Sequence, residues 1–168
     1  MKTPKLTVVG AGPGDPDLIT LKAVKALKAA DVVMYDALVN TALLDYVRPN
    51  AELIFVGKRS GCYRYEQEQI NELIVARGHS HGHVVRLKGG DPFIFGRGAE
   101  EMEYAASFGL ETAVVPGISS SLAVPAYQNI PVTKRGSSES FWVITGTTKQ
   151  HQISSDVKLA AQSNATVV

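Results

Sequence analysis

The residues best suited to chemistry in this sequence stand in short glycine-rich or polar segments. Each segment directly follows a short run rich in β-branched residues, and the segments comprise residues 10–15, 36, 57–59, 88–98 and 116–117. The carboxyl ends of parallel strands lie at the same edge of a sheet, where helix N-termini and loop amides converge. We therefore expect these segments to share one rim and to form a ligand site there.

The first segment, Gly-Ala-Gly-Pro-Gly-Asp at residues 10–15, resembles a dinucleotide-binding turn but departs from it. That fingerprint requires a glycine where this sequence has Asp15. Pro13 removes one backbone amide, and a carboxylate at the helix start would repel a pyrophosphate. The segment favours a ligand with a positive charge, although a tight glycine turn without a ligand stays open as an alternative.

The segment from Lys88 to Gly98 holds more functional residue types than any other. Gly89 and Gly90 allow the backbone to approach a ligand closely, and the Asp-Pro pair that follows favours a turn. Phe93 and Phe95 are large apolar side chains in a loop, which predicts an aromatic lining for a flat ligand. The alternative is that both pack under the following helix.

Short β-branched runs alternate with segments of helical period, which predicts an α/β fold with a parallel sheet flanked by helices. The expected strands are Leu6–Gly10, Val32–Tyr35, Leu53–Val56, Val84–Leu87 and Thr112–Val115. The expected helices begin at Asp15-Pro16, run from Gln67 to Arg77 with Gly78 as a stop, and run from Gly98 to Phe108. In the first helix the expected apolar stripe is Leu18, Leu21, Val24 and Leu27, with Lys22, Lys25 and Lys28 facing water.

We predict a domain boundary after residue 116. Residues 1–116 would form an N-terminal α/β domain, and residues 117–168 would begin a second, incomplete α/β domain. The second part offers a strand at Phe141–Thr145, a helix at Ser155–Gln162 and an apolar end at Ala165–Val168. So few elements bury too little apolar surface to stand alone, and the second domain therefore looks cut short.

Composition excludes several classes of protein. With 45% hydrophobic and 20% charged residues, the 168-residue chain is typical of a soluble globular protein. The 17 Lys+Arg against 16 Asp+Glu leave no basic footprint for nucleic acid. No apolar run approaches the roughly 20 residues that span a membrane, and no signal peptide is visible, which together favour the cytoplasm.

Two smaller features concern metals and redox chemistry. Cys62 is the one cysteine, so it has no partner for an internal disulfide or a zinc site and is interpreted as a spare thiol. His79, His81 and His83 alternate, which would put three imidazoles on one face of a strand. We favour a solvated turn there and predict no metal site.

Five motifs together resemble the uroporphyrinogen-III C-methyltransferases of the tetrapyrrole methylase family. They are Val9–Thr20, Tyr35–Val39, Val56–Arg59, Arg86–Gly98 and Val115–Ser119, in the family's order and at its spacing. The first is shared with sister enzymes that methylate later corrinoid intermediates. The Leu-Lys-Gly-Gly-Asp-Pro-Phe-Ile-Phe-Gly-Arg-Gly run is particular to the uroporphyrinogen branch. The resemblance covers the chain from Leu6 onward.

The resemblance implies a two-domain enzyme that holds S-adenosylmethionine in the cleft between its domains. It would methylate uroporphyrinogen III at two ring positions, giving precorrin-2 for sirohaem or cobalamin, and would be a homodimer in its full-length form. The implied proton acceptor is Asp36 and the implied proton donor Lys58. The implied cofactor contacts are Pro13, Gly89, Gly90, Asp91, Ile94, Ser119 and Ser120. The family usually has Thr-Ala at the last two positions, and serine keeps the hydroxyl of the threonine.

These implied roles agree with elementary chemistry. Carbonyl oxygens and carboxylates suit a positive sulfonium, which fits Asp15 and Asp91. The substrate is a polycarboxylate, so its pocket should collect cations although the chain is nearly neutral. The candidate cations are Lys58, Arg59, Arg64, Arg86, Lys88, Arg97, Lys134 and Arg135, of which we favour Arg59 and Arg135.

Three alternatives stay open at this point. Family members continue beyond the length of this chain, so it is expected to be a shortened form, inactive or able only to bind cofactor. A related precorrin methyltransferase is the second. An unrelated nicotinamide-dependent oxidoreductase is the third, which Pro13 and Asp15 argue against.

Overall fold

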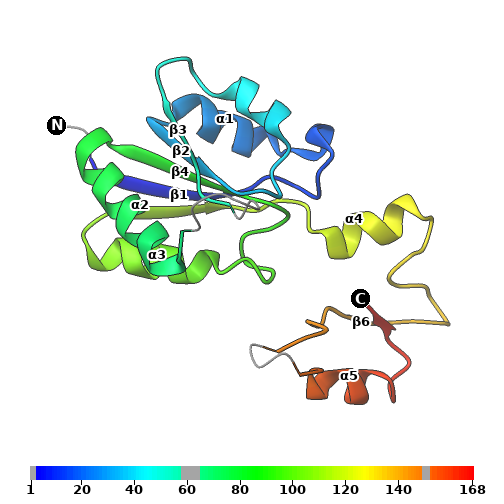
Figure 1. The fold of residues 1–168 in the computed structure, drawn as a ribbon. Helices are drawn as coiled ribbons and strands as arrows, with labels where there is room; N and C mark the ends of the chain where they lie inside the picture. Colours follow the sequence, from blue (N-terminus) through cyan, green and yellow to red (C-terminus); the bar gives the residue numbers. More distant parts are fainter. Residues whose placement is uncertain (1–2, 58–64, 149–151) are drawn as a thin grey trace. The chain divides into compact units, whose positions relative to one another are not determined.

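The computed structural model describes residues 3–57, 65–148 and 152–168 (Figure 1). They pack as two compact units, Met1–Ser119 and Ser120–Val168. In the described residues no helix is both long enough and apolar enough to cross a membrane. The division into an N-terminal domain and the start of a second one, placed above after residue 116, stays a prediction.

The first unit is built on a five-stranded parallel sheet, which confirms the predicted α/β class. Its strands are β1 (Lys5–Gly10), β2 (Val32–Tyr35), β3 (Glu52–Phe55), β4 (His83–Lys88) and β5 (Glu111–Val115). They lie in the order β3-β2-β4-β1-β5, with Val8 opposite Arg86 in the central pair. β1 and β4 are buried almost throughout because helices cover both faces of the sheet.

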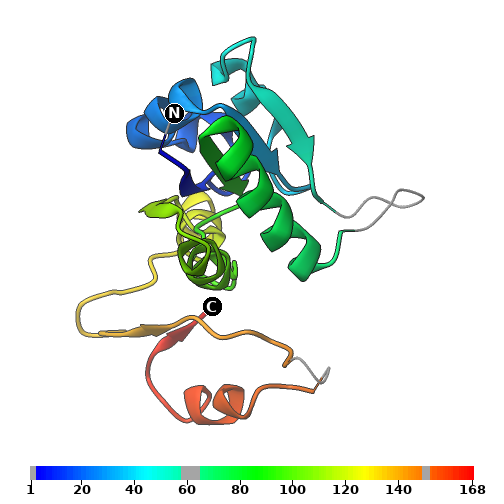
Figure 2. The same ribbon diagram turned by 90° about the vertical axis from the view of Figure 1, so that its left-hand side faces the viewer.

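Helices cover both faces of the sheet (Figures 1 and 2), and an apolar core lies on each face. On one face, α1 (Leu21–Ala29) and the 3₁₀ helix η2 (Thr41–Tyr46) pack with Val9 and Leu87. On the other face, α2 (Gln67–His81) and α3 (Gly98–Ser107) pack with Leu6 and Val8. Neighbouring residues of β1 enter opposite cores because strand side chains alternate between faces.

The topology brings β4 between β2 and β1. The chain leaves β1 and β2 toward the face that α1 and η2 cover, whereas it leaves β4 toward the face of α2 and α3. Neighbouring strands whose connections depart to opposite faces leave a crevice at their carboxyl ends, where open parallel sheets bind ligands. The sheet therefore has such a switch point on both sides of β4.

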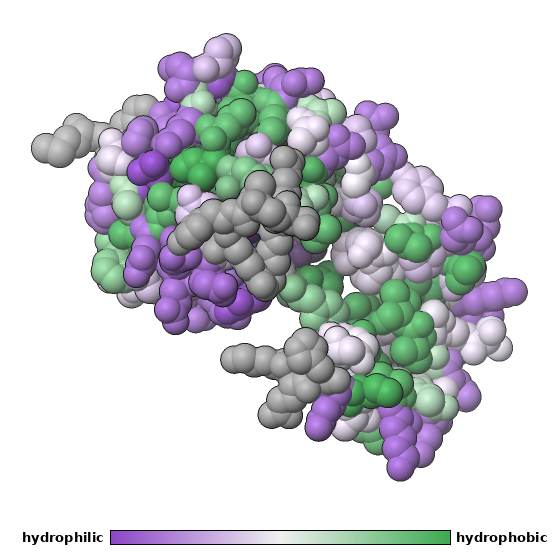
Figure 3. All heavy atoms as spheres, in the orientation of Figure 1, coloured by the Kyte–Doolittle hydropathy of each residue, from purple (hydrophilic) through white to green (hydrophobic). Residues whose placement is uncertain are grey.

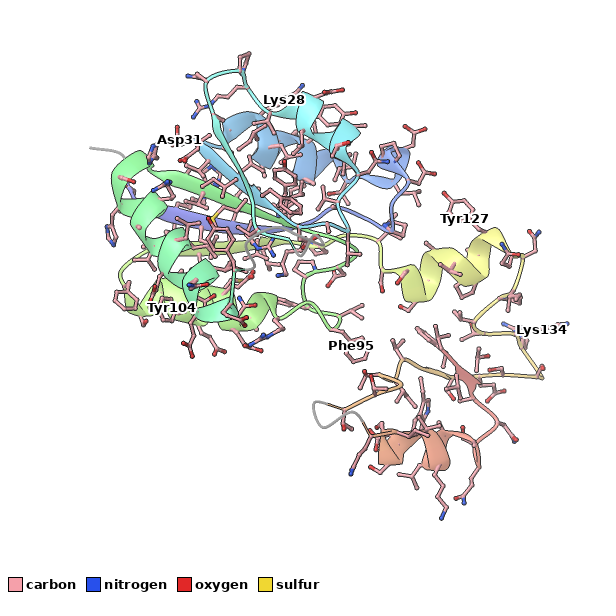
Figure 4. The ribbon with its side chains drawn as sticks, in the orientation of Figure 1. Lys28, Asp31, Phe95, Tyr104, Tyr127 and Lys134 are labelled. Carbon is pink, nitrogen blue, oxygen red and sulfur yellow. The ribbon has the colours of Figure 1, made fainter. Side chains whose placement is uncertain are left out.

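The first helix begins later than predicted. Asp15 caps only a 3₁₀ turn, η1 (Pro16–Leu18), by accepting a hydrogen bond from the Asp17 amide at 2.9 Å. A second cap follows at Thr20, whose hydroxyl accepts from the Ala23 amide, and α1 starts only there. The buried face of α1 therefore differs from the predicted apolar stripe. Ala23 and Leu27 are buried, whereas the predicted stripe residue Leu21 is 81% exposed. The three lysines face water as predicted, and Lys28 is labelled in Figure 4.

The prediction that Gly78 stops α2 is wrong. Gly78 is buried inside the helix, where a Cβ would come within 2.5 Å of the Leu110 side chain, so glycine serves close packing. The helix ends at Gly82, whose φ of 108° few other residues adopt.

His79 and His81 are exposed, as predicted, but the prediction that they form a turn is wrong. His79 and His81 belong to the last turn of α2, and His83 begins β4. Their rings contact different partners: the Phe108 carbonyl, Ser80 and Thr7, respectively. No cluster of three metal-binding side chains occurs among the described residues.

The second unit contains α4 (Ser120–Tyr127), β6 (Phe141–Trp142), α5 (Ser155–Ala160) and β7 (Thr166–Val167), with β6 and β7 parallel. The predicted strand and helix occur in shorter form. Helix α4 was not predicted, since small residues and Pro125 mask its pattern. Hydrophobic residues, coloured green, are visible on the surface of this unit (Figure 3). Its exposed large apolar side chains include Leu122, Val124 and Leu159.

The environment of His83 predicts a pH-dependent stability. Its Nε2 lies 2.8 Å from the Thr7 hydroxyl and its Nδ1 3.3 Å from the Ala29 carbonyl, an arrangement that a neutral ring satisfies by accepting at Nε2 and donating at Nδ1. Burial lowers the pKa of His83, and the Ala29 hydrogen bond opposes this. The unfolded chain therefore binds the proton more readily, and stability falls as the pH drops through about 6.5.

We expect the urea midpoint of the wild-type chain to fall more between pH 7.5 and 5.5 than that of His83→Gln. His79→Gln is the matched control, because the exposed His79 ring has one carbonyl contact, and its urea midpoint should change with pH as in the wild type. If the midpoint of His83→Gln also changes with pH as in the wild type, His83 is not the source of the pH dependence.

Candidate active site at the carboxyl ends of the strands

The loops that follow β1 and β4 are hydrogen-bonded to each other at the switch point. The Ala11 amide donates to the Lys88 carbonyl at 2.7 Å, and Gly12 and Gly90 form a reciprocal pair at 3.2 and 2.7 Å. Gly90 has a φ of 66°, a conformation that glycine adopts without strain. This pair fixes the two glycine-rich loops side by side.

The segment after β5 closes on the same two loops. The Gly117 amide donates to Asp91 Oδ2 at 3.0 Å. A Cβ built on Gly117 would lie 2.3 Å from the Gly90 carbonyl oxygen and 2.7 Å from the Gly10 Cα, and both of these neighbours are backbone atoms. The backbones of three loops thus come into direct contact, which only glycine allows here.

The segments after β2 and β3 join this assembly. Asn40 donates from Nδ2 to the Gly14 carbonyl at 2.9 Å, while its Oδ1 accepts from the Ala42 amide and caps η2. A Cβ on Gly57, the last described residue after β3, would lie 2.5 Å from the Ala37 amide nitrogen. The described residues that follow the five strands therefore meet at one rim, as the sequence predicts.

Most of the predicted cofactor residues lie in these joined loops. Pro13, Gly89, Gly90 and Asp91 are half-buried there. Ile94 is 40% exposed in the β4 loop, and Ser119 is buried at the end of the first unit.

Four other predicted site residues do not belong to the described part of the first unit. Ser120 begins α4 in the second unit, and Arg135 is exposed elsewhere in that unit. Lys58 and Arg59 lie outside the described residues, as does Cys62.

The rim carboxylates are held by backbone amides. Asp91 accepts from Phe93 and Gly117 with separate oxygens, at 2.8 and 3.0 Å, and Asp15 accepts from Asp17. Their negative charges are thus held in defined positions among the loops. This arrangement suits a cation better than a phosphate.

Phe93 and Phe95 do not pack under the following helix. Their side chains are 54% and 66% exposed, and Figure 4 shows Phe95 at the tip of the loop between β4 and α3. The loop folds back instead on Pro92, whose carbonyl accepts from the Gly98 amide at 3.0 Å. Leu38, in the loop after β2, is 76% exposed. Large apolar side chains held in water at a rim are typical of a binding surface.

A buried ionic cluster lies directly beneath the rim, and sequence reasoning missed it. Arg86 and Lys88 are 3% and 6% exposed, and both reach Oε1 of the fully buried Glu101, at 3.3 and 3.0 Å. Arg86 also approaches Asp36 Oδ2 at 3.4 Å. Because both cations are buried and paired, their suggested contact with substrate carboxylates is not supported.

One signal could have revealed this cluster. Residues 86 and 88 share one face of a strand in an apolar core, so two cations there require a buried anion. Glu101 stands in the first turns of the next helix. Burial lowers the pKa of the Lys88 ammonium, the charge of Arg86 lowers it further, and Glu101 opposes both.

Comparisons with known proteins agree with this geometry. The family model "Tetrapyrrole (Corrin/Porphyrin) Methylases" matches residues 5–168. A uroporphyrinogen-III C-methyltransferase of Methanocaldococcus jannaschii is 48% identical over 99% of this chain and 69% of its own length. One from Synechocystis is 53% identical over 84% of this chain and 54% of its own length. A siroheme synthase of Photorhabdus laumondii is 48% identical, and this chain spans 35% of its length.

Solved structures give the same result. The uroporphyrin-III C-methyl transferase of Thermus thermophilus, complexed with S-adenyl homocysteine, is 41% identical with a TM-score of 0.75. The match covers 90% of this chain and 63% of that one. A cobalt precorrin-4 methyltransferase has a TM-score of 0.76 at 31% identity and is covered to 61%.

Proposed function

Because the chain belongs to the tetrapyrrole (corrin/porphyrin) methylase family, we propose that it carries out the S-adenosylmethionine-dependent C-methylation of uroporphyrinogen III. Two ring positions are methylated and precorrin-2 results, for sirohaem or cobalamin. The observation that carries the proposal is the rim at which the loops after β1, β4 and β5 touch through Gly10, Gly90 and Gly117.

The rim fits the cofactor chemically. S-adenosylmethionine supplies a methyl group on a positive sulfonium. Asp91 offers a carboxylate held in place by two amides, and Gly89 and Gly90 let a ligand approach the backbone. The residues proposed to hold the cofactor are Pro13, Gly89, Gly90, Asp91, Ile94, Ser119 and Ser120.

Asp36 is the proposed proton acceptor. Methylation of a pyrrole carbon changes the proton balance of the ring, and a carboxylate at the rim can accept the proton. The Asp36 side chain is 22% exposed, so it is reachable, and its Oδ1 accepts from the Leu38 amide at 3.0 Å. Lys58, which follows Gly57 in the sequence, is the proposed proton donor on the resemblance alone.

The substrate is proposed to contact two kinds of group. The exposed Leu38, Phe93 and Phe95 offer apolar surface to the macrocycle. Arg59 and Arg135 are proposed to bind its carboxylates. The full-length protein is proposed to be a cytoplasmic homodimer whose second α/β domain begins within residues 117–168.

Precorrin methylation is a second candidate, favoured by the structural similarity to the cobalt precorrin-4 methyltransferase. The higher identity to the uroporphyrinogen-III enzymes supports the first candidate.

The test adds S-adenosylmethionine and uroporphyrinogen III to the chain and follows the absorbance. We expect a precorrin-2-type spectrum to grow, and calorimetry to detect S-adenosylhomocysteine binding. Binding without any product would leave only the cofactor-binding part of the proposal. Product from a methylated precorrin alone would favour the second candidate, and binding of a nicotinamide nucleotide instead would overturn both.

A further inference from the structure

The guanidinium of Arg86 is held at every nitrogen. Its Nη1 donates to the carbonyls of Leu87 and Met34, at 2.8 and 3.4 Å, and its Nε donates to Glu101 at 3.3 Å. The remaining nitrogen, Nη2, points to Asp36 Oδ2 at 3.4 Å. Because two of these contacts are to strand backbone, the group cannot turn without breaking them.

Glu101 lies behind Arg86 and has no solvent-exposed surface. Its Oε1 accepts from Arg86, Lys88 and Gln67, the last at 3.2 Å, while Oε2 has no hydrogen-bond partner within residues 3–57, 65–148 and 152–168. A buried carboxylate with one unsatisfied oxygen is expensive, and apolar residues of similar volume often stabilise a core as well as an ion pair does. Stability alone is therefore a weak reason for these charges beneath the rim.

The contacts of Asp36 indicate what the cluster achieves. One carboxylate oxygen accepts from the Leu38 amide and the other faces Arg86, so both ends of the group are defined. Lys88, the other buried cation, pairs with Glu101. Glu101 thus holds Arg86, and Arg86 in turn contacts the second oxygen of Asp36.

We infer that Arg86, held in place by Glu101, is a positioning residue that sets the orientation of the Asp36 carboxylate at the rim. The inference rests on the proposed function, in which Asp36 accepts a proton. A displacement of about 1 Å in such a group can cost a large share of its catalytic effect.

Two variants test the inference. Arg86→Lys keeps a charge for Glu101 but loses the planar fork that reaches the backbone and Asp36 together. Arg86→Met removes the guanidinium and leaves Glu101 paired with Lys88 at 3.0 Å, so no buried charge loses its only partner. Arg77→Met is the control, since Arg77 forms a partly exposed pair with Glu52, at 2.8 and 3.1 Å, outside this cluster.

The first readout is the amide resonance of Leu38 in the ¹⁵N spectrum of the labelled chain, because this amide donates to Asp36. We expect it to move in both Arg86 variants and to stay in place in Arg77→Met. The second readout is turnover: kcat should fall about tenfold or more, with KM and the Kd of S-adenosylhomocysteine within about twofold of wild type.

A folded Arg86 variant with the wild-type Leu38 resonance would overturn the inference. A folded Arg86 variant whose KM rises while its kcat is unchanged would overturn it as well. If the wild-type chain shows no turnover, the proposed function fails, and the Leu38 resonance still decides the positioning role. Circular dichroism identifies which of the two variants is folded, and either one suffices.

Discussion

Replacing Asp36 with asparagine should lower kcat for methylation of uroporphyrinogen III by about 100-fold or more, since a positioned acid–base group contributes roughly 10²- to 10⁴-fold. Asparagine keeps the shape of the side chain and an oxygen for the Leu38 amide, so the loop after β2 should stay folded. The loss would therefore report the missing carboxylate. The measurement is the rate of growth of the product spectrum at saturating substrates.

The control for this variant is Asp45→Asn, an exposed carboxylate on η2, the element that follows the same loop. It should retain the wild-type rate. Binding of S-adenosylhomocysteine by Asp36→Asn should stay within about twofold of wild type, because Asp36 is proposed to act on the proton and not on the cofactor. A kcat within threefold of wild type would remove Asp36 from the proposed chemistry.

Replacing Gly117 with alanine should disrupt the rim itself. The new Cβ would meet the Gly90 carbonyl oxygen at 2.3 Å and the Gly10 Cα at 2.7 Å, and backbone atoms on both sides cannot move independently. Overpacking of this kind costs about 1–3 kcal/mol and sometimes more. We expect a lower denaturation midpoint and at least a tenfold weaker Kd for S-adenosylhomocysteine by calorimetry.

Gly146→Ala is the matched control, because a Cβ at Gly146 has open space around it. It should leave both the midpoint and the Kd unchanged. If Gly117→Ala binds S-adenosylhomocysteine with wild-type affinity, the contact between the loops after β1, β4 and β5 does not form the cofactor site.

The elements of the first unit follow from local pattern. β2 matches its predicted range, Val32–Tyr35, and the other four strands of the sheet differ from prediction by a residue or so at their ends. Buried parallel strands are continuous β-branched runs, and their loops carry glycine and polar residues, so both signals are present within a few neighbouring residues. The shared rim was predictable too, since the carboxyl ends of parallel strands lie at one edge of the sheet.

The start of α1 and the end of α2 were not predictable in this way, because they depend on packing against distant residues. Asp15-Pro16 and Thr20 are both sound helix starts, and the packing of Ala23 and Leu27 on the sheet accompanies the second. Gly78 has the residue type of a stop but the environment of a tight contact with Leu110. In each case the local signal was ambiguous, and burial decided.

The candidate site divides along the same line. Residue types and spacing alone indicated the glycine loops, Asp36 and Asp91, because each stands next to a strand end. Only the tertiary structure placed β4 between β2 and β1, paired Gly12 with Gly90, and buried Arg86 and Lys88 against Glu101. Functional motifs made of neighbouring residues can be recognised in the sequence. The partner of a buried charge cannot, because it depends on which distant segments the fold brings together.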